Sequence, residues 1–264
     1  MRVIALLATY NEERFLRACL EHLVQQGIEV YLIDNESTDR TVEIAQRYRG
    51  CGLVDLETMP RYGVYSWRPI LERKEQLAAT LDADWFIHLD ADEIRLPPDS
   101  GRTLAQALLE ADRNGYNAVN FMEFSFVPSR ESPDHDHADF LRTMRAYYPF
   151  LPSFPHRLNA WKRQTGPVDL AWSGGHQVRF PNLRMYPNSF PMRHYLFLSI
   201  PHAVEKYVRR SYDPGEVASG WHRTRAGLQA KKITLQNESE LRIYRGGAAL
   251  DASNPLKRHP LFGV

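Results

Sequence analysis

Short apolar runs alternate with helical patterns along the first third of the chain. The runs lie at residues 3–8, 30–33, 53–57 and 85–89, and each has the length of a buried strand. Helices that separate such strands act as crossover connections between parallel neighbours. The alternation therefore predicts an α/β fold with a mostly parallel sheet and right-handed crossovers.

The stretches between these runs carry mostly apolar side chains at helical spacing. The three sets are Phe15, Leu16, Cys19, Leu20 and Leu23; Val42, Ala45 and Tyr48; and Ile70, Lys74, Leu77 and Leu81. Each set predicts a helix with one buried face. We expect Asn11 to cap the first helix, and Gly27 and Gly50 to end the first two.

The rest of the chain is less regular. Patterns predict a helix over residues 103–114, strands over 117–127 and 155–162, and a helix that begins after Ser199. Residues 129–139 read as an exposed charged loop, which includes His135 and His137. No repeat or linker interrupts the sequence, so we expect one domain over residues 1–264.

Composition bounds the possible partners and the location. The chain has 33 basic and 32 acidic residues, which argues against a nucleic-acid binder with a uniformly basic surface. Residues 201–264 nevertheless carry 11 Lys or Arg against 6 Asp or Glu. The apolar start at residues 3–8 is too short for a signal peptide or a membrane span. We expect a cytoplasmic protein, with peripheral association at the inner face of the membrane left open.

Polar residues follow three of the predicted strands. They occupy residues 9–12, 34–39 and 90–93, and the last two segments are rich in carboxylates. Ligands of open parallel sheets bind outside the carboxyl ends of the strands. These three segments are therefore the predicted ligand site.

Asp90 and Asp92 form the most informative of three Asp-x-Asp pairs in the chain. This pair directly follows an apolar strand, whereas Asp82/Asp84 and Asp134/Asp136 read as solvated turns. Mg²⁺ and Mn²⁺ commonly combine one or two protein carboxylates with phosphate oxygens of a substrate. The pair therefore predicts a divalent metal site that neutralises a leaving diphosphate.

Three blocks together resemble glycosyltransferase family 2, which has the GT-A fold. They are Ala-Thr-Tyr-Asn-Glu-Glu at residues 8–13, Ile-Asp-Asn-Glu-Ser-Thr-Asp-Arg-Thr at 33–41, and His-Leu-Asp-Ala-Asp-Glu at 88–93. The resemblance implies a Rossmann-like sheet with a nucleotide-sugar-binding half at residues 1–95. Residues 96–264 would form the acceptor-side half. The implied reaction moves a sugar, with inversion, from a nucleotide-diphosphate sugar to a saccharide or lipid-linked acceptor, using Mn²⁺ or Mg²⁺.

The resemblance also implies roles for residues of the matching blocks. Thr9, Asn11 and Glu12 would lie against the nucleoside, and Asp34 would contact the base or ribose. Either Arg73 or Lys74 would supply a basic group near the nucleotide. Asp90, next to Ala91 in the nucleotide-sugar site, would contact ribose or metal, and Asp92 would bind the metal.

The second half is similar to a bacterial branch of the family that serves surface-polysaccharide synthesis. The similarity rests on residues 156–162, 173–176, 192–195 and 220–222. It implies His194 as a further metal ligand. Lys206 and Arg210 are four residues apart on a predicted helix, where they would share a face and clamp the diphosphate.

An inverting transferase needs a general base for the acceptor hydroxyl. The Glu-Asp pair usual in the family is replaced here by Ser-Gly-Gly-His at residues 173–176. His176 is the first candidate, since imidazole suits base chemistry near neutral pH. Asp169 and Glu123 are the alternatives, the latter on a predicted strand with an inward face.

Two other functions compete with glycosyl transfer. A nucleotidyltransferase would use a related sheet, but a Gly-rich phosphate loop should follow its first strand, and Thr9–Glu12 is no such loop. A non-catalytic module that binds nucleotide sugars or carbohydrate stays possible because the Glu-Asp pair is missing. A dehydrogenase is disfavoured, since no Gly-x-Gly-x-x-Gly stands at the first turn.

Overall fold

The computed structural model describes residues 1–222, 224–247 and 249–261, which form two compact units. Unit 1 comprises residues 1–61, 67–121 and 155–192. Unit 2 comprises residues 62–66, 122–154 and the described residues from 193 onward. Both units draw on both halves of the chain, and the single domain over residues 1–264 stays a prediction.

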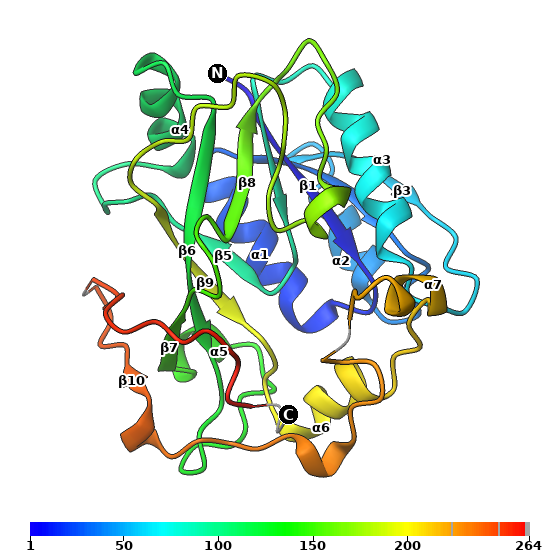
Figure 1. Cartoon of the computed structure of the whole chain (residues 1–264), viewed down its shortest axis with the longest axis vertical. Coiled ribbons are helices and arrows are strands. Elements are labelled where there is room, and N and C mark those ends of the chain that lie inside the picture. Colours follow the sequence, from blue (N-terminus) through cyan, green and yellow to red (C-terminus); the bar gives the residue numbers. More distant parts are fainter. Residues whose placement is uncertain (223, 248, 262–264) are drawn as a thin grey trace. The chain divides into compact units, whose positions relative to one another are not determined.

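Four parallel strands form the first part of the sheet in unit 1. They are β1 (Val3–Thr9), β2 (Glu29–Asp34), β3 (Leu53–Thr58) and β4 (Trp85–Leu89), in the spatial order β4-β1-β2-β3. Helices α1 (Glu13–Gln25), α2 (Thr41–Gln46) and α3 (Trp67–Thr80) connect them (Figure 1). The predicted strands, helices and parallel directions are confirmed.

Helix α1 buries the five side chains that its sequence spacing selects, from Phe15 to Leu23. Gly27 follows it with φ of +72°, as expected of a helix-terminating glycine. The predicted cap is wrong, because Glu12 occupies that position without a side-chain cap bond. Asn11 instead has φ of +55° and accepts a hydrogen bond from the Thr38 amide, which ties the first turn to the second.

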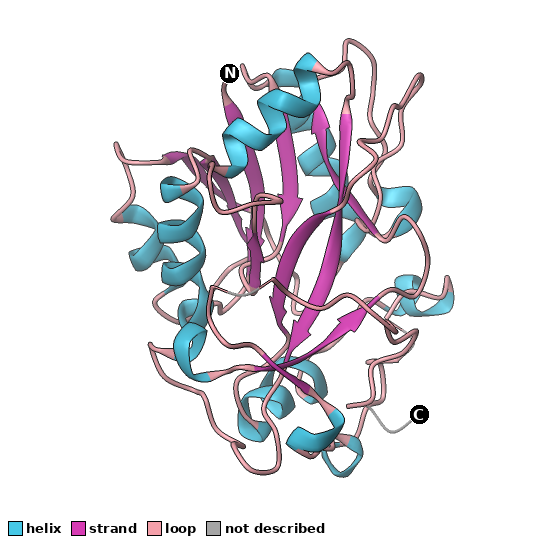
Figure 2. Cartoon of the chain, turned by 90° about the vertical axis from the view of Figure 1, so that its left-hand side faces the viewer, coloured by secondary structure: helices cyan, strands magenta, loops and turns pink. Residues whose placement is uncertain are grey.

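Two antiparallel strands extend the sheet beyond β4. Strand β8 (Arg157–Lys162) pairs with β4, and the first part of β6 (Ala118–Phe126) pairs with β8. Helix α4 (Leu104–Arg113) and the 3-10 turn η1 (Ala171–Ser173) also belong to unit 1. The α/β class with helices beside a sheet is confirmed (Figure 2), while the sheet is mixed where the sequence predicts mostly parallel pairing.

No sequence pattern predicts the remaining strands. Strand β5 (Glu93–Arg95) pairs with β9 (Phe190–Tyr195), whose last residues belong to unit 2. In unit 2, β7 (Ala146–Phe150) pairs antiparallel with the end of β6 and with β10 (Arg242–Ile243). Strands β5 and β10 have only three and two residues, which is too few for an alternating pattern to be visible in the sequence.

Short helices complete unit 2. They are α5 (Phe140–Thr143), α6 (Ile200–Ala203), the π-helix η2 (Val204–Val208), α7 (Pro214–Ala218), and the 3-10 turns η3 (Ala230–Lys232) and η4 (Glu238–Glu240). Ser199 caps α6 as predicted, with its Oγ accepting from the His202 amide. The unit's core gathers Tyr148, Leu196, Phe197 and Tyr207. Within the described residues, no helix combines the length and apolar character needed to cross a bilayer.

The capping box of α4 gives a stability prediction. Thr103 Oγ1 accepts from the Gln106 amide at 3.3 Å, and Gln106 Oε1 accepts from the Thr103 amide at 2.8 Å. Replacing Thr103→Ala should lower the free energy of unfolding by about 1 kcal/mol, since the cap bond is lost. Urea denaturation measures this. Glu72→Ala, on the exposed face of α3, is the control and should stay within about 0.5 kcal/mol of the parent; equal losses in both variants would contradict the capping role.

Candidate active site

The turns after β1 and β2 are held together by hydrogen bonds. Thr9 Oγ1 donates to Asp34 Oδ1 at 3.5 Å, and both side chains are buried. The Asn11 amide donates to Ser37 Oγ at 2.9 Å, and the Glu12 amide donates to Thr41 Oγ1 at 2.8 Å. The four residues predicted to face a nucleoside, Thr9, Asn11, Glu12 and Asp34, therefore lie in one interlocked region.

Tyr10 and Arg61 add a contact that the sequence does not reveal. The Arg61 guanidinium carbon lies 3.6 Å from the centre of the Tyr10 ring, within cation–π distance. The Arg61 amide also donates to Glu36 Oε2 at 2.9 Å. Because the two residues are far apart in sequence, only the fold shows that they meet beside the first two turns.

The acidic turn, residues 90–93, closes on itself at the end of β4. The Glu93 amide donates to the Asp90 carbonyl at 3.1 Å, and Glu93 Oε2 accepts from the Asp90 amide at 3.2 Å. Ala91, Asp92 and Glu93 are buried, and Asp90 is partly so. The two predicted metal-binding carboxylates thus stand on a rigid turn.

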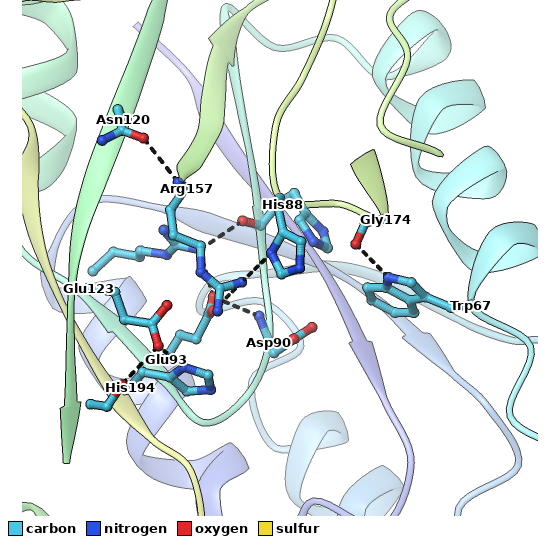
Figure 3. A network of polar contacts seen from close by, with 12 residues as sticks. Trp67, His88, Asp90, Glu93, Asn120, Glu123, Arg157, Gly174 and His194 are labelled. Carbon is cyan, nitrogen blue, oxygen red and sulfur yellow. Dashed lines mark hydrogen bonds and ion pairs between the residues drawn. The ribbon is translucent and has the colours of Figure 1, made fainter. Parts of the chain in front are cut away.

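Two arginines hold Glu93 in this position. Arg95 Nη2 donates to Glu93 Oε2 at 2.6 Å. Arg157 Nη1 lies 3.7 Å from Glu93 Oε1 (Figure 3). Arg95 is fully buried and also donates to the His88 carbonyl at 3.3 Å. Neither arginine was predicted as a site residue, since one lies on an unpredicted strand and the other arrives from β8.

The surroundings of Asp90 make its carboxyl group harder to ionise. Burial, with Glu93 and Asp92 nearby, raises the pKa of Asp90 above its usual range, while Lys74 and Arg157 oppose the rise. Metal ligands must be deprotonated, so protons and a cation compete for Asp90. A divalent cation would relieve this repulsion among carboxylates.

The two basic residues predicted near the nucleotide lie in different environments. Arg73 forms a two-point ion pair with Glu57, with Nε–Oε1 and Nη2–Oε2 both 2.8 Å, and it also contacts Gln76. Lys74 is fully buried, and its Nζ lies 2.9 Å from His88 Nδ1. Lys74 therefore offers no surface to a nucleotide in this structure.

The Gly174–Gly175–His176 turn packs against the end of β4. Trp67 Nε1 donates to the Gly174 carbonyl at 2.9 Å (Figure 3). Gly175 has φ of +85°, and a Cβ there would lie 2.8 Å from His88 Nε2, so glycine is needed. His176 is exposed, stacks on His156 with ring centres 5.2 Å apart, and accepts from Arg157 Nη1 at 3.0 Å through Nδ1.

Asp169, the second candidate base, supports the same segment from outside. Its Oδ1 accepts from the Trp172 amide at 2.9 Å, and its Oδ2 pairs with Arg179 Nη2 at 2.6 Å. These contacts begin the η1 turn and bind it to the opposing strand segment at Arg179. They give the carboxylate a structural role.

Glu123 and His194 belong to unit 2, where they contact each other. Glu123 is fully buried, as its inward strand position predicts, and its Oε1 lies 2.8 Å from His194 Nδ1. Ser125 Oγ donates to the same carboxylate oxygen at 3.0 Å. The pair is a buried carboxylate that fixes the orientation of an imidazole ring.

Two further predictions for unit 2 fail on local geometry. Lys206 lies in the π-helix η2, which ends at Val208 before Arg210, so the two cations do not share a face of one α-helix. Lys206 lies over Tyr207, and Arg210 lies over Tyr65. His135 is buried rather than exposed, with Nδ1 3.0 Å from Thr143 Oγ1.

The metal-binding potential of the site rests on Asp90 and Asp92. Over the described part of the chain, no group of three or more His, Cys, Asp or Glu side chains is arranged to hold a metal ion. Two carboxylates on one turn still fit Mg²⁺ or Mn²⁺, which take their other ligands from water and substrate phosphates. The donor set therefore suits a metal that is completed by a phosphorylated ligand.

A sheet with polar turns at its strand ends and a carboxylate pair after the fourth strand is the architecture expected of a glycosyltransferase. A model of the family "Glycosyl transferase family 2" matches residues 5–165, which is more than half of the chain. The chain belongs to this family, as the sequence blocks predict. A comparison with curated proteins finds no match.

A comparison with solved structures finds matches of low sequence identity. The crystal structure of S. aureus TarS 1–349 has 12% identity and a TM-score of 0.45, with 74% of this chain and 60% of that chain covered. Its complex with UDP-GlcNAc has 15% identity, a TM-score of 0.42, and coverage of 74% and 58%. Glucosyl-3-phosphoglycerate synthase from Mycobacterium tuberculosis, with Mn²⁺, UDP and phosphoglyceric acid, has 18% identity, a TM-score of 0.32, and coverage of 46% and 43%. The matches thus span less than two thirds of each of these chains.

The shared Glu93 carboxylate gives the prediction for this site. Glu93→Gln keeps an oxygen acceptor for the Asp90 amide but removes the charge that pairs two buried arginines. The free energy of unfolding should fall by about 3 kcal/mol, because uncompensated buried charge is costly. Chemical denaturation measures the change. Arg179→Gln, which breaks the exposed pair with Asp169, should cost less than about 1 kcal/mol; similar losses in the two variants would show that Glu93 does not anchor the turn.

Proposed function

We propose that this glycosyltransferase moves a sugar from a nucleotide-diphosphate sugar to a saccharide or lipid-linked acceptor, with inversion and with Mn²⁺ or Mg²⁺. The observation that carries the proposal is the acidic turn at the end of β4, held by Glu93 beside the linked turns after β1 and β2. All of these residues lie in unit 1 and in the part of the chain that the family model matches.

Residues of the first two turns would bind the nucleoside. The carboxylate of Asp34 accepts the Ser37 amide at 3.0 Å, which fixes its orientation and leaves its other oxygen beside Thr9. Carboxylates accept hydrogen bonds from ribose hydroxyls and base N–H groups. Thr9, Asn11, Glu12 and Asp34 are the proposed nucleoside contacts, and the Tyr10 ring, covered on one side by Arg61, is added to them.

Asp90 and Asp92 would hold the metal. When bound, the metal would neutralise the negative charge that develops on the departing diphosphate. His194 is proposed as a further ligand on the chemistry of its own surroundings. A histidine that binds a metal through one nitrogen commonly donates its other N–H to a carboxylate. The Glu123 carboxylate, next to His194 Nδ1, is placed to accept such a bond.

Cations would bind the diphosphate. Lys206 and Arg210 are both partly exposed and remain proposed phosphate contacts, although each acts from its own segment. Arg157, next to the acidic turn, is added to them. The guanidinium group presents several donors in one plane, which suits phosphate oxygens.

His176 is the proposed general base. Its Nδ1 accepts from Arg157, so this nitrogen takes up a proton from the acceptor hydroxyl only after Arg157 is released. Glu93, at 3.7 Å, is the partner that retains Arg157 when this happens. Asp169 and Glu123 are the alternatives. To accept a proton, Asp169 would have to give up its ion pair with Arg179, and Glu123 its contact with His194.

The setting of the reaction follows from the resemblance to the polysaccharide branch of the family. A lipid-linked or saccharide acceptor would be used in surface-polysaccharide synthesis at the inner face of the membrane. This part of the proposal concerns only the acceptor and the location, and it does not depend on how the donor binds.

Donor binding is tested by calorimetric titration of UDP, GDP and dTDP sugars with and without Mn²⁺. One of the donors should bind more tightly with Mn²⁺. Asp92→Asn should weaken the metal-dependent binding by more than the roughly 10- to 100-fold caused by loss of an outer-shell partner. Asp82→Asn, in the exposed Asp-x-Asp pair, is the matched control and should bind like the parent.

Two results would count against the proposed donor site. One is a folded parent protein that binds none of the three donor classes with metal enhancement. The other is an Asp92→Asn variant that retains the parent's metal-dependent affinity. Either would remove the acidic turn from the donor site.

The base assignment is tested by steady-state hydrolysis of the identified donor, with water as acceptor. His176→Ala should lower kcat by about 10²- to 10⁴-fold, the usual contribution of general-base catalysis, while the donor Kd changes little. Asp169→Asn and Glu123→Gln are measured alongside. A loss of kcat confined to either of these variants would move the base to that residue.

A further inference from the structure

Lys74 is a buried cation that the nucleotide-binding proposal does not use. Its side chain is 0% exposed in the middle of α3, so it touches neither solvent nor a ligand at the surface. Burying an ammonium group is costly unless charges or hydrogen bonds compensate. A lysine at this position therefore needs a physical reason.

The contacts of Lys74 lead to His88. Nζ lies 2.9 Å from His88 Nδ1, and the ammonium is the donor because protonated lysine has no acceptor. The Trp67 ring completes one side, 5.4 Å from Nζ and 5.7 Å from the His88 ring centre. On the other side, Gly175 packs so closely against His88 that a Cβ added to this glycine would clash with His88 Nε2.

His88 links its contact with Lys74 to the acidic turn. It lies two residues before Asp90, and its carbonyl accepts from Arg95 Nη2. Arg95 binds Glu93. Glu93 in turn accepts a hydrogen bond from the Asp90 amide (Figure 3). Two sets of hydrogen bonds, joined through the covalent frame of His88, thus connect the Lys74 ammonium to the backbone of the predicted metal ligand.

Electrostatics explains how the cation is tolerated. Burial lowers the pKa of Lys74 to about 8, while the carboxylates of Asp90 and Glu93 counteract the fall. Burial and the same ammonium hold the pKa of His88 well below its usual range. The nearby carboxylates thus offset part of the cost of burying the ammonium that contacts His88.

We propose that Lys74 is a positioning residue, which fixes the acidic turn through His88 and so prepares Asp90 and Asp92 for the metal, without contacting the nucleotide. The inference rests on the proposed metal-dependent function. It replaces the role near the nucleotide that the sequence suggests for Lys74. It also explains why His88, on the face of β4 that meets α3 and the Gly174–Gly175 turn, is surrounded so closely.

The first test is amide hydrogen exchange of the metal-free protein, so its readout does not depend on activity. Lys74→Met keeps the length of the side chain and removes its donor. Exchange in peptides covering residues 85–96 should become faster, while peptides from α1 and β2 keep the parent's protection. Arg68→Met, on the exposed side of the same helix, is the control and should match the parent throughout.

A matched pair at His88 covers the case in which Lys74→Met does not fold. Asn and Leu have nearly the same shape, but Asn Oδ1 can replace Nδ1 as the acceptor for Lys74, whereas Leu cannot. His88→Asn should retain the protection of residues 85–96, and His88→Leu should lose it. Equal protection in both variants would overturn the proposal.

The second test is binding of Mn²⁺ alone, followed by electron paramagnetic resonance. Lys74→Met should bind Mn²⁺ about 10- to 100-fold more weakly than the parent, the range typical of lost outer-shell support. Parent-like exchange and parent-like Mn²⁺ affinity would overturn the positioning role. A parent protein that does not bind Mn²⁺ would instead refute the metal-dependent function, while the exchange result would still decide whether Lys74 fixes the turn.

Discussion

The carboxylate of Glu93 is the contact on which the geometry of the site depends. One side chain accepts the Asp90 amide and pairs with Arg95 and Arg157, so it joins the end of β4 to β5 and β8. Strands β4 and β5 are neighbours along the chain, whereas β8 is far from both in sequence and joins them only in the folded sheet. The buried Glu93 carboxylate binds groups at the ends of all three strands and thereby fixes the turn that carries Asp90 and Asp92.

Much of the fold could be predicted because its information is local. Residues 3–89 alternate buried strands with amphipathic helices, and both periodicities are visible without knowledge of tertiary contacts. Asn11 shows where local rules end. It is a good capping residue, but its side chain binds Thr38 of the next turn, and the resulting φ of +55° excludes it from the cap. Lys206 and Arg210 show the same limit, since a π-helix alters the spacing that an α-helix would give.

The candidate site divides in the same way. Thr9, Asp34 and Asp90 could be found because each directly follows a strand, and strand ends are places where ligands bind. Arg95 and Arg157 could not be found, since nothing in the sequence indicates that they meet Glu93. Lys74 was recognised as basic, yet its burial follows from the packing of α3 against the sheet, and burial changes what such a residue can do.

Charge balance suggests why so many cations surround the acidic turn. Asp90, Asp92 and Glu93 place three carboxyl groups within a few residues, and Lys74, Arg95 and Arg157 are the cations that act on them. Attraction between paired buried charges offsets part of the cost of removing them from water. An unpaired buried charge instead shifts the pKa of its group toward the neutral form. The protein's own cations can therefore keep the turn in place before any metal arrives. A metal bound to such a preformed turn would be free to exchange with the diphosphate, because the shape of the turn would not depend on it.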